Sequence, residues 1–313
     1  MNKLNVLKSA CPLNSTQRTR VHAPRCLWMM AMLCLLVLGP NAFAYEGKHH
    51  QQLTFLAAMQ FNQCVMESTI PMLTALQVRY IARSNVGLAE TNFFVRMFRW
   101  SYYDREDQLE RSSLWLIDTR FHEHFNEIVA RLGRAREPVQ IYRDLGRILG
   151  YVQSVTSPAH AVPVYTARFW RLSFSDRFDN YPLDDVALAA ALGDDCSFLE
   201  QYYDSYEDVL RATATDTLAA VTAPIAGMPV SWEAFWLLDE DIDDFGEYGS
   251  AGNSFGRSTS FRCGDGQRCV LLDDDPLYAE FALQRHLQAI RSSLAVMQLM
   301  QRSLMENASV QSQ

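Results

Sequence analysis

Apolar residues recur three and four positions apart through much of this chain, and this helical periodicity limits the possible folds more than any other feature. Such stripes run through residues 106–132 and 137–157, and further helices are expected from Gln51, over Cys196–Val221 and over Leu277–Met305. Runs of alternating polar and apolar residues, which indicate strands, are few and short. The sequence therefore predicts an all-α, multi-helix domain.

The segments between these helices are expected to form long irregular loops. Residues 161–195 and 240–274 are rich in Gly, Asp, Ser and Asn, which favour turns. Asp275 and Pro276 suit the N-cap and the first turn of the last helix. Residues 306–313 are polar and are expected to form a disordered tail, so the folded domain is expected over residues 45–305.

The N-terminal segment has the three parts of a secretory signal peptide. Residues 1–26 carry five basic and no acidic residues, and residues 27–39 form an apolar run that is short for a membrane span. Pro40 and the small-residue site Ala42-Phe43-Ala44 follow. We expect cleavage after Ala44 and export to the periplasm or the cell exterior; the alternative is an uncleaved membrane anchor. No later stretch is long and apolar enough to cross a membrane, so no integral membrane segment is expected after processing.

Removal of residues 1–44 makes the remaining chain strongly acidic. The whole chain has 28 Lys and Arg and 36 Asp and Glu; the leader holds five of the basic and none of the acidic residues, which leaves 23 against 36 and a net charge of −13. Nucleic acid is bound mainly by neutralising its phosphates, so a partner of this protein is not expected to be duplex nucleic acid.

Four cysteines remain after the leader: Cys64, Cys196, Cys263 and Cys269. An even number in an oxidising compartment predicts two disulfides. Cys263 and Cys269 flank a Gly-Asp-Gly turn that can bring them together, which leaves Cys64 for Cys196. Four cysteines allow three connectivities, and this one is preferred.

Histidines are the strongest candidates for a functional site. His49 and His50 follow Tyr45 closely, and a terminal amine and an imidazole can bind the same zinc ion. The alternative is a disordered polar N-terminus. His122 and His124 lie about 200° apart on a helix, so at most one can bind a given ion.

A further histidine and several carboxylates complete the candidates. His160 follows Ser-Pro-Ala at the end of a helix, where the helix dipole favours a histidine even without function. Asp104 can be a ligand, a general base or an N-cap. Asp179 is the last residue of a short segment, 175–179, and is one of its two carboxylates. Residues 239–244 and 273–275 are expected to be solvated or to cap helices, because they lack the alternating oxygen ligands of a calcium loop.

In their order, these residues resemble the zinc-dependent phospholipase C family and its single-strand-specific nuclease relatives. The closest match is GYVQSVTSPAH, Gly150 to His160, which is similar to the family's HYLGDLTQPMH. The resemblance covers residues 45–181 and implies a helical domain in which zinc ions and a metal-activated water cleave a phosphodiester. It implies the following site residues, with Asp104 also as the catalytic base: Tyr45 through its terminal amine, His50, Asp104, His122 or His124, His160 and Asp179.

The chain departs from the family pattern at three ligand positions. Gly150 stands where the family has His, Ser154 where it has a metal-bridging Asp, and Ser175 where it has another His. Glycine has no ligand atom in its side chain and serine is a poor zinc ligand, so fewer than three zinc ions are expected.

Two functions follow from these observations. The first is an exported, zinc-dependent phosphodiester hydrolase acting on a phospholipid or another phosphate ester. The second is a non-catalytic helical protein of the cell envelope or the exterior that keeps the fold and binds a lipid, a peptide or an envelope component. An enzyme with a different ligand set is a third reading, in which the aromatic residues of segment 232–257 would line a substrate cleft; at their spacings, packing into a core and turns is preferred. The sequence does not determine the oligomeric state.

Overall fold

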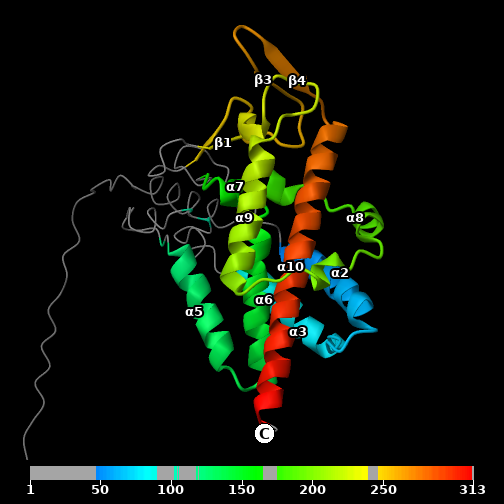
Figure 1. Ribbon diagram of the computed structural model, residues 1–313. Coiled ribbons are helices and arrows are strands. Elements are labelled where there is room, and N and C mark those ends of the chain that lie inside the picture. Colours follow the sequence, from blue (N-terminus) through cyan, green and yellow to red (C-terminus); the bar gives the residue numbers. More distant parts are fainter. Residues whose placement is uncertain are drawn as a thin grey trace, which may run out of the picture. The chain divides into compact units, whose positions relative to one another are not determined.

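The computed structural model describes residues 47–89, 102, 103, 105, 118, 120–164, 175–238 and 246–311, all within one compact unit, Ala42–Gln313. They form eight α-helices and two small antiparallel sheets (Figure 1). The helices are α2 (Gly47–Val65), α3 (Ala75–Ala89), α5 (Phe121–Arg134), α6 (Pro138–Ser154), α7 (Pro158–Ala161), α8 (Asp185–Leu192), α9 (Tyr206–Thr222) and α10 (Pro276–Gln311). The 3-10 helices are η1 (Phe178–Asn180), η2 (Ser197–Leu199) and η3 (Trp232–Ala234).

Helix α6 is the centre of the main core. It contacts α2, α3, α5, α9 and α10, and Figure 1 shows α10 running alongside α9. Residues 150–154 of α6 are all buried. A helix that is surrounded in this way is expected to be apolar on every side, and the buried Leu145, Ile148, Leu149 and Val152 satisfy this expectation. Gln153 is an exception, since its polar side chain is fully buried.

Helices α3 and α6 approach closely at Gly146. A Cβ atom at this position would overlap the carbonyl oxygen of Ile81 and crowd Ser84 on α3. Glycine is therefore required here by the distance between two helix backbones, not by a turn.

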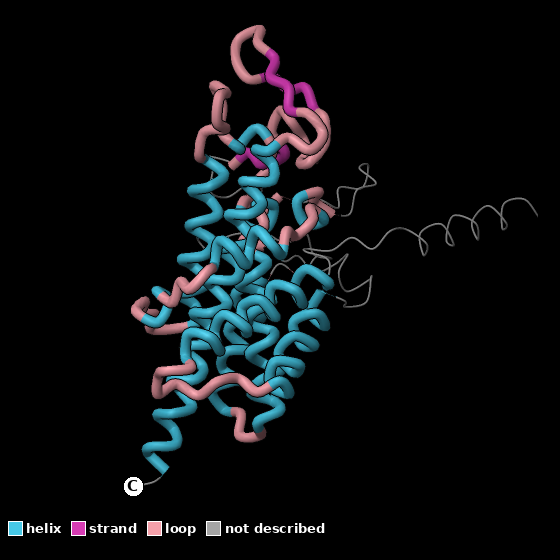
Figure 2. The backbone as a smooth tube through the Cα atoms, turned by 90° about the vertical axis from the view of Figure 1, so that its right-hand side faces the viewer, coloured by secondary structure: helices cyan, strands magenta, loops and turns pink. Residues whose placement is uncertain are grey.

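A second, aromatic core lies beside the strands. Strand β1 (Trp236–Leu237) pairs with β2 (Glu247–Tyr248), and β3 (Thr259–Arg262) pairs with β4 (Arg268–Leu271). Figure 2 shows these strands near one end of the described helices. The core contains Phe178, Trp232, Phe235, Trp236, Phe255, Phe261, Tyr278 and Phe281. Trp232, Trp236 and Phe255 are thus buried core residues and do not line a cleft.

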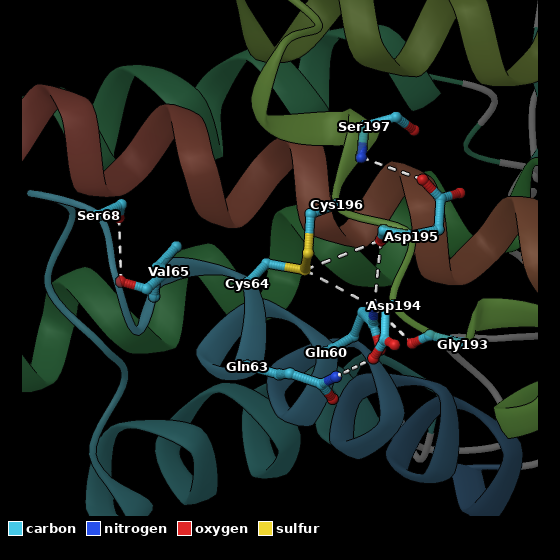
Figure 3. The surroundings of a disulfide bond; sticks show 10 residues. All are labelled: Gln60, Gln63, Cys64, Val65, Ser68, Gly193, Asp194, Asp195, Cys196 and Ser197. Carbon is cyan, nitrogen blue, oxygen red and sulfur yellow. Dashed lines mark hydrogen bonds between the residues drawn. A yellow bond between two sulfur atoms is a disulfide. The ribbon is translucent and has the colours of Figure 1, made fainter.

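Two disulfides have the predicted connectivity. Cys64 at the end of α2 is bonded to Cys196 just before η2, a separation of 132 residues, and Cys263 is bonded to Cys269 across the β3–β4 hairpin. Around the first disulfide, Gln60 on α2 donates hydrogen bonds to the carbonyl oxygens of Gly193 and Asp195 at 3.2 and 3.1 Å (Figure 3). The disulfide therefore reinforces a contact that hydrogen bonds also hold.

The prediction of a mostly helical fold is confirmed. Asp275 caps α10 as expected, since its Oδ1 accepts a hydrogen bond from the backbone N–H of Leu277 at 3.1 Å. Among the described residues, no helix combines the length and the apolar composition needed to span a membrane. The predicted leader, residues 1–44, lies outside the described residues.

Several elements differ from the prediction. Helix α3 was not predicted, since the buried polar Asn85 interrupts its apolar stripe. Helix α8 lies within a predicted loop; its Ala-rich sequence has no stripe, and Asp184 caps it through the backbone N–H of Ala187. Helix α9 begins at Tyr206 and not at Cys196, because Ser205 caps it. Strands β2 to β4 lie in the predicted loop 240–274, and α10 continues through much of the predicted tail to Gln311.

Candidate functional site

Asp179 lies at the centre of a buried group of polar side chains from three separate segments. Its carboxylate atom Oδ1 accepts a 2.6 Å hydrogen bond from the Ser157 hydroxyl, and Oδ2 lies 3.7 Å from Nε2 of His160. Its backbone carbonyl accepts a 3.2 Å hydrogen bond from Nδ1 of His49, 130 positions away in sequence. Asp179 itself is only 2% exposed.

The first turn of α2 places two consecutive histidines in this region. Consecutive residues of a helix point about 100° apart, so both can be buried only if the turn is covered from two sides. His49 points to η1, and His50 points to α6, where its Nδ1 donates a 2.8 Å hydrogen bond to Oε1 of Gln153. The alternative of a disordered N-terminus is therefore wrong from Gly47 onward.

His160 is carried by the short helix α7. The sequence predicts it at the end of the preceding helix, but α6 ends at Ser154 and α7 forms a separate turn. Ser157 occupies the N-cap of α7 without capping it, because its hydroxyl bonds to Asp179. The backbone N–H of Tyr103 donates a 2.7 Å hydrogen bond to the carbonyl of His160, which joins this turn to residues 102 and 103.

The environment keeps His50 neutral. Burial is the main reason that the pKa of His50 falls to about 4; the imidazoles of His160 and His49 lower it further, while the hydrogen bond to Gln153 and the charge of Asp179 oppose the shift. A neutral imidazole is the form that binds metal ions. His50 is thus uncharged at neutral pH.

A second buried carboxylate, Asp176, connects this site to the aromatic core. Its oxygens accept hydrogen bonds from Nε1 of Trp236 at 2.9 Å, the hydroxyl of Tyr248 at 2.9 Å and the backbone N–H of Phe178 at 2.8 Å. Burial and the nearby charge of Asp179 raise the pKa of Asp176 above its usual value. These bonds attach η1, and with it Asp179, to strands β1 and β2.

His286 of α10 lies on another side of η1. Its ring centroid is 5.7 Å from that of Phe178. Burial lowers the pKa of His286 to about 3, with smaller contributions from His49 and Arg285. Four histidines are therefore buried or nearly buried around η1 and α7: His49, His50, His160 and His286.

The predicted ligands do not all come together. His160 and Asp179 lie side by side, with Nε2 of His160 3.7 Å from Oδ2 of Asp179. His50 is buried next to His49, which bonds to the Asp179 carbonyl, but the His50 ring itself bonds to Gln153. His122 packs against the Tyr103 ring at 5.0 Å, and Tyr103 in turn bonds to the turn that carries His160.

The other predicted ligands lie elsewhere or outside the described residues. Nε2 of His124 lies 2.7 Å from Oδ2 of Asp118, so this histidine belongs to a separate pair at the start of α5. Tyr45 and Asp104 lie outside the described residues.

A complete metal centre is not formed within the described part of the chain. There, no group of three or more His, Cys, Asp or Glu side chains has an arrangement that could hold a metal ion. Ser154, at the position of the family's bridging Asp, donates a 2.7 Å hydrogen bond to the carbonyl of Gly150 and so bonds within its own helix. The two donors that do approach each other, the His160 imidazole and the Asp179 carboxylate, are of types that bind zinc.

Two participants in this site could not be identified from the sequence. Gln153 occupies the apolar stripe of a helix, and Ser157 precedes a proline as an ordinary N-cap does. His49 was a candidate, but its contact with the backbone carbonyl of Asp179 could not be foreseen. The only signal for Gln153 was a polar residue inside an otherwise apolar helical face.

Comparison of the chain with models of known protein families, with curated proteins and with solved structures gives no match. The resemblance to the phospholipase C family thus depends on the motif residues alone and stays a prediction.

Proposed function

We propose that this protein is an exported, metal-dependent phosphoesterase of the phospholipase C class with a reduced zinc site. The observation that supports this proposal is that Nε2 of His160 lies 3.7 Å from the buried carboxylate of Asp179. A third predicted ligand, His50, is buried beside His49, which bonds to the Asp179 carbonyl. The two disulfides support export, because disulfides are typical of oxidising compartments.

His50, His160 and Asp179 would hold a zinc ion together with Asp104 and the terminal amine of Tyr45. A bound zinc ion supplies a Lewis acid that polarises phosphoryl oxygens. Asp104 would accept a proton from the attacking water.

The surrounding residues prepare the ligands for this role. Burial keeps His50 neutral, and the Ser157 hydroxyl fixes one oxygen of Asp179 while the other faces His160. Hydrogen bonds of this kind orient metal ligands and strengthen metal binding.

The test is a zinc and activity measurement on protein whose chain begins at Tyr45, because only cleavage frees the amine of that residue. We expect on the order of one zinc ion per chain, which a chelator removes. We also expect zinc-dependent hydrolysis of bis(p-nitrophenyl) phosphate or of phosphatidylcholine vesicles. A chain that keeps residues 1–44 should bind zinc more weakly.

A pair of histidine variants makes the test specific. His160→Ala should lose the zinc, whereas His124→Ala should keep it, since His124 is paired with Asp118 outside the site. Correctly processed protein that contains no zinc, or whose zinc is unaffected by His160→Ala, would show that the proposal is wrong.

A second candidate function is a non-catalytic binding protein of the cell envelope or the exterior, which retains a helical fold without the zinc site. The hydrogen bond from Ser154 to Gly150 favours it, because both residues stand at ligand positions of the family and here bond to each other within one helix. It predicts that a chelator leaves the melting temperature unchanged and that no phosphate ester is hydrolysed. Zinc-dependent turnover that Asp104→Asn abolishes would exclude it.

A further inference from the structure

We propose that Gln153 is a positioning residue that holds the His50 imidazole in the tautomer with its proton on Nδ1. Nε2 then carries the lone pair that a metal ligand or a general base needs. The use of that lone pair rests on the proposed function, whereas the tautomer rests on the hydrogen bonds alone.

The orientation of the Gln153 amide follows from the hydroxyl protons around it. Ser293 donates its hydroxyl proton to the carbonyl of Ala289 at 2.7 Å, so its oxygen can only accept from Gln153. The amide atom that faces Ser293 at 3.0 Å must therefore be the nitrogen Nε2. The oxygen Oε1 then faces the other way, toward His50.

Asn85 independently leads to the same orientation. Thr54 donates its hydroxyl proton to the carbonyl of His50 at 2.8 Å, so the Asn85 atom that lies 2.8 Å from the Thr54 hydroxyl must be the donor Nδ2. The same nitrogen lies 2.8 Å from Oε1 of Gln153 and donates to it. Two hydroxyl groups on different helices thus assign the Gln153 oxygen to the side of His50.

The tautomer of His50 follows directly. An amide oxygen accepts hydrogen bonds and cannot donate them, so Nδ1 of His50, 2.8 Å away, must carry the proton. In a neutral ring the other nitrogen, Nε2, then has the lone pair.

The network joins four helices out of contact with solvent. Thr54 of α2, Asn85 of α3, Gln153 of α6 and Ser293 of α10 are all completely buried. Water cannot compete for these bonds, and no member can turn without leaving another buried group unsatisfied. The tautomer of His50 is thereby set by the packing of the helices.

The test is a long-range proton–nitrogen NMR spectrum of the histidine rings, recorded above pH 7 on protein freed of metal with a chelator. His50 is assigned by the signals that disappear in His50→Asn. The wild-type protein should show His50 with the proton on Nδ1. Gln153→Met, which keeps the size and removes the acceptor, should move the proton wholly or partly to Nε2. Gln298→Met is the matched control, because Gln298 is also buried but donates to the carbonyl of Leu199.

Gln153→Glu provides a second variant if Gln153→Met does not fold. A carboxylate still accepts from Nδ1 and adds a negative charge, so the His50 signals should move toward the doubly protonated ring. A wild-type His50 with its proton on Nε2 would overturn the proposal. So would a His50 spectrum that neither folded Gln153 variant changes.

Zinc binding separates this inference from the proposed function. Gln153→Met should lower zinc affinity about 10- to 100-fold relative to Gln298→Met, as is typical for partners of metal ligands. If the tautomer changes as expected but wild-type protein binds no zinc, the proposed function is wrong and the assignment of Gln153 stands. If wild-type protein binds zinc but Gln153→Met alters neither the tautomer nor the zinc affinity, the assignment of Gln153 is wrong and the proposed function stands.

Discussion

The hydroxyl of Ser157 donates a 2.6 Å hydrogen bond to Oδ1 of Asp179, and both side chains are buried. This bond explains why Ser157, at the N-cap of α7, does not cap the helix. It also fixes the carboxylate whose other oxygen faces His160 at 3.7 Å. One serine thus couples the α6–α7 turn to η1 and holds the candidate site together.

Removing this hydroxyl should destabilise the protein. In Ser157→Ala, one oxygen of a buried carboxylate loses its partner, and we expect a loss of about 2 kcal/mol in the free energy of unfolding, measured by urea denaturation. The control is Ser250→Ala, whose hydroxyl donates to the carbonyl of Arg262 at an exposed position and should change stability by less than about 0.5 kcal/mol. Equal stabilities of the two variants would contradict the structural role given to Ser157.

The two disulfides should differ in their contribution to stability. On the loop-entropy relation, Cys64–Cys196, with its separation of 132 residues, contributes about 5 kcal/mol and Cys263–Cys269, with a separation of 6, about 2 kcal/mol. Replacing each pair by alanines and comparing urea midpoints measures the difference. A larger loss for the hairpin pair would mean that strain or local packing outweighs chain entropy.

Asp144 on α6 should be essential for stability because it is a fully buried charge. It accepts hydrogen bonds from Arg131, Gln140 and Arg147 at 2.6–3.0 Å. Asp144→Asn removes the charge with which the two arginines pair; because Arg131 and Arg147 are 42% and 40% exposed, the expected cost is about 1–2 kcal/mol. Glu123→Gln, which removes an exposed partner of Arg120, should cost less than about 1 kcal/mol.

The acid sensitivity of Asp144 has a definite sign. Burial by itself would raise the pKa of Asp144, but the hydrogen bonds from Arg131 and Gln140 and the charges of Arg131 and Arg147 hold it below its usual value of 3.8. Its stabilising contribution is thus complete above about pH 4 and is lost as the pH falls below that value. Asp144→Asn should flatten the dependence of unfolding free energy on pH in this acidic range only.

His286 should produce a loss of stability at milder acidity. Because burial lowers its pKa from 6.5 to about 3, the unfolded chain binds a proton in this range that the native protein does not. Stability is therefore complete above pH 6.5 and falls as the pH decreases toward 3. His286→Phe should reduce the slope between pH 6 and 4 by about 1.4 kcal/mol per pH unit, measured by urea denaturation of chelator-treated protein. Parallel curves for variant and wild type would show that His286 does not cause this loss.

A methyl group at Gly146 should destabilise the contact between α3 and α6. Since the added Cβ would overlap the carbonyl of Ile81, Gly146→Ala is expected to cost about 1–3 kcal/mol in spite of its better helix propensity. Gly133→Ala on α5 is the control, because nothing lies within 4 Å of its added Cβ. That substitution should stabilise the protein by about 0.5–1 kcal/mol.

Much of the helical architecture could be predicted because it depends on local spacing. The stripe Phe121, Phe125, Ile128 and Leu132 is buried on α5 as its periodicity indicates. The prediction was incomplete where local signals are weak or tertiary contacts dominate. Asn85 is polar yet buried within α3, and the hairpin of β3 and β4 is held by a disulfide and by Phe261 and Leu271 packing into the aromatic core.

The sequence by itself determined the helical class, a preferred pairing of the four cysteines and the types of residue that could bind a metal ion. These features follow from spacing, residue chemistry and an even cysteine count, which act along the chain. Only the tertiary structure decided that His160 approaches Asp179, that His124 is paired with Asp118, and that His50 bonds to Gln153. Residues about a hundred positions apart are brought together by the packing of α2, α6, α7 and η1, and no local pattern in the chain records that packing.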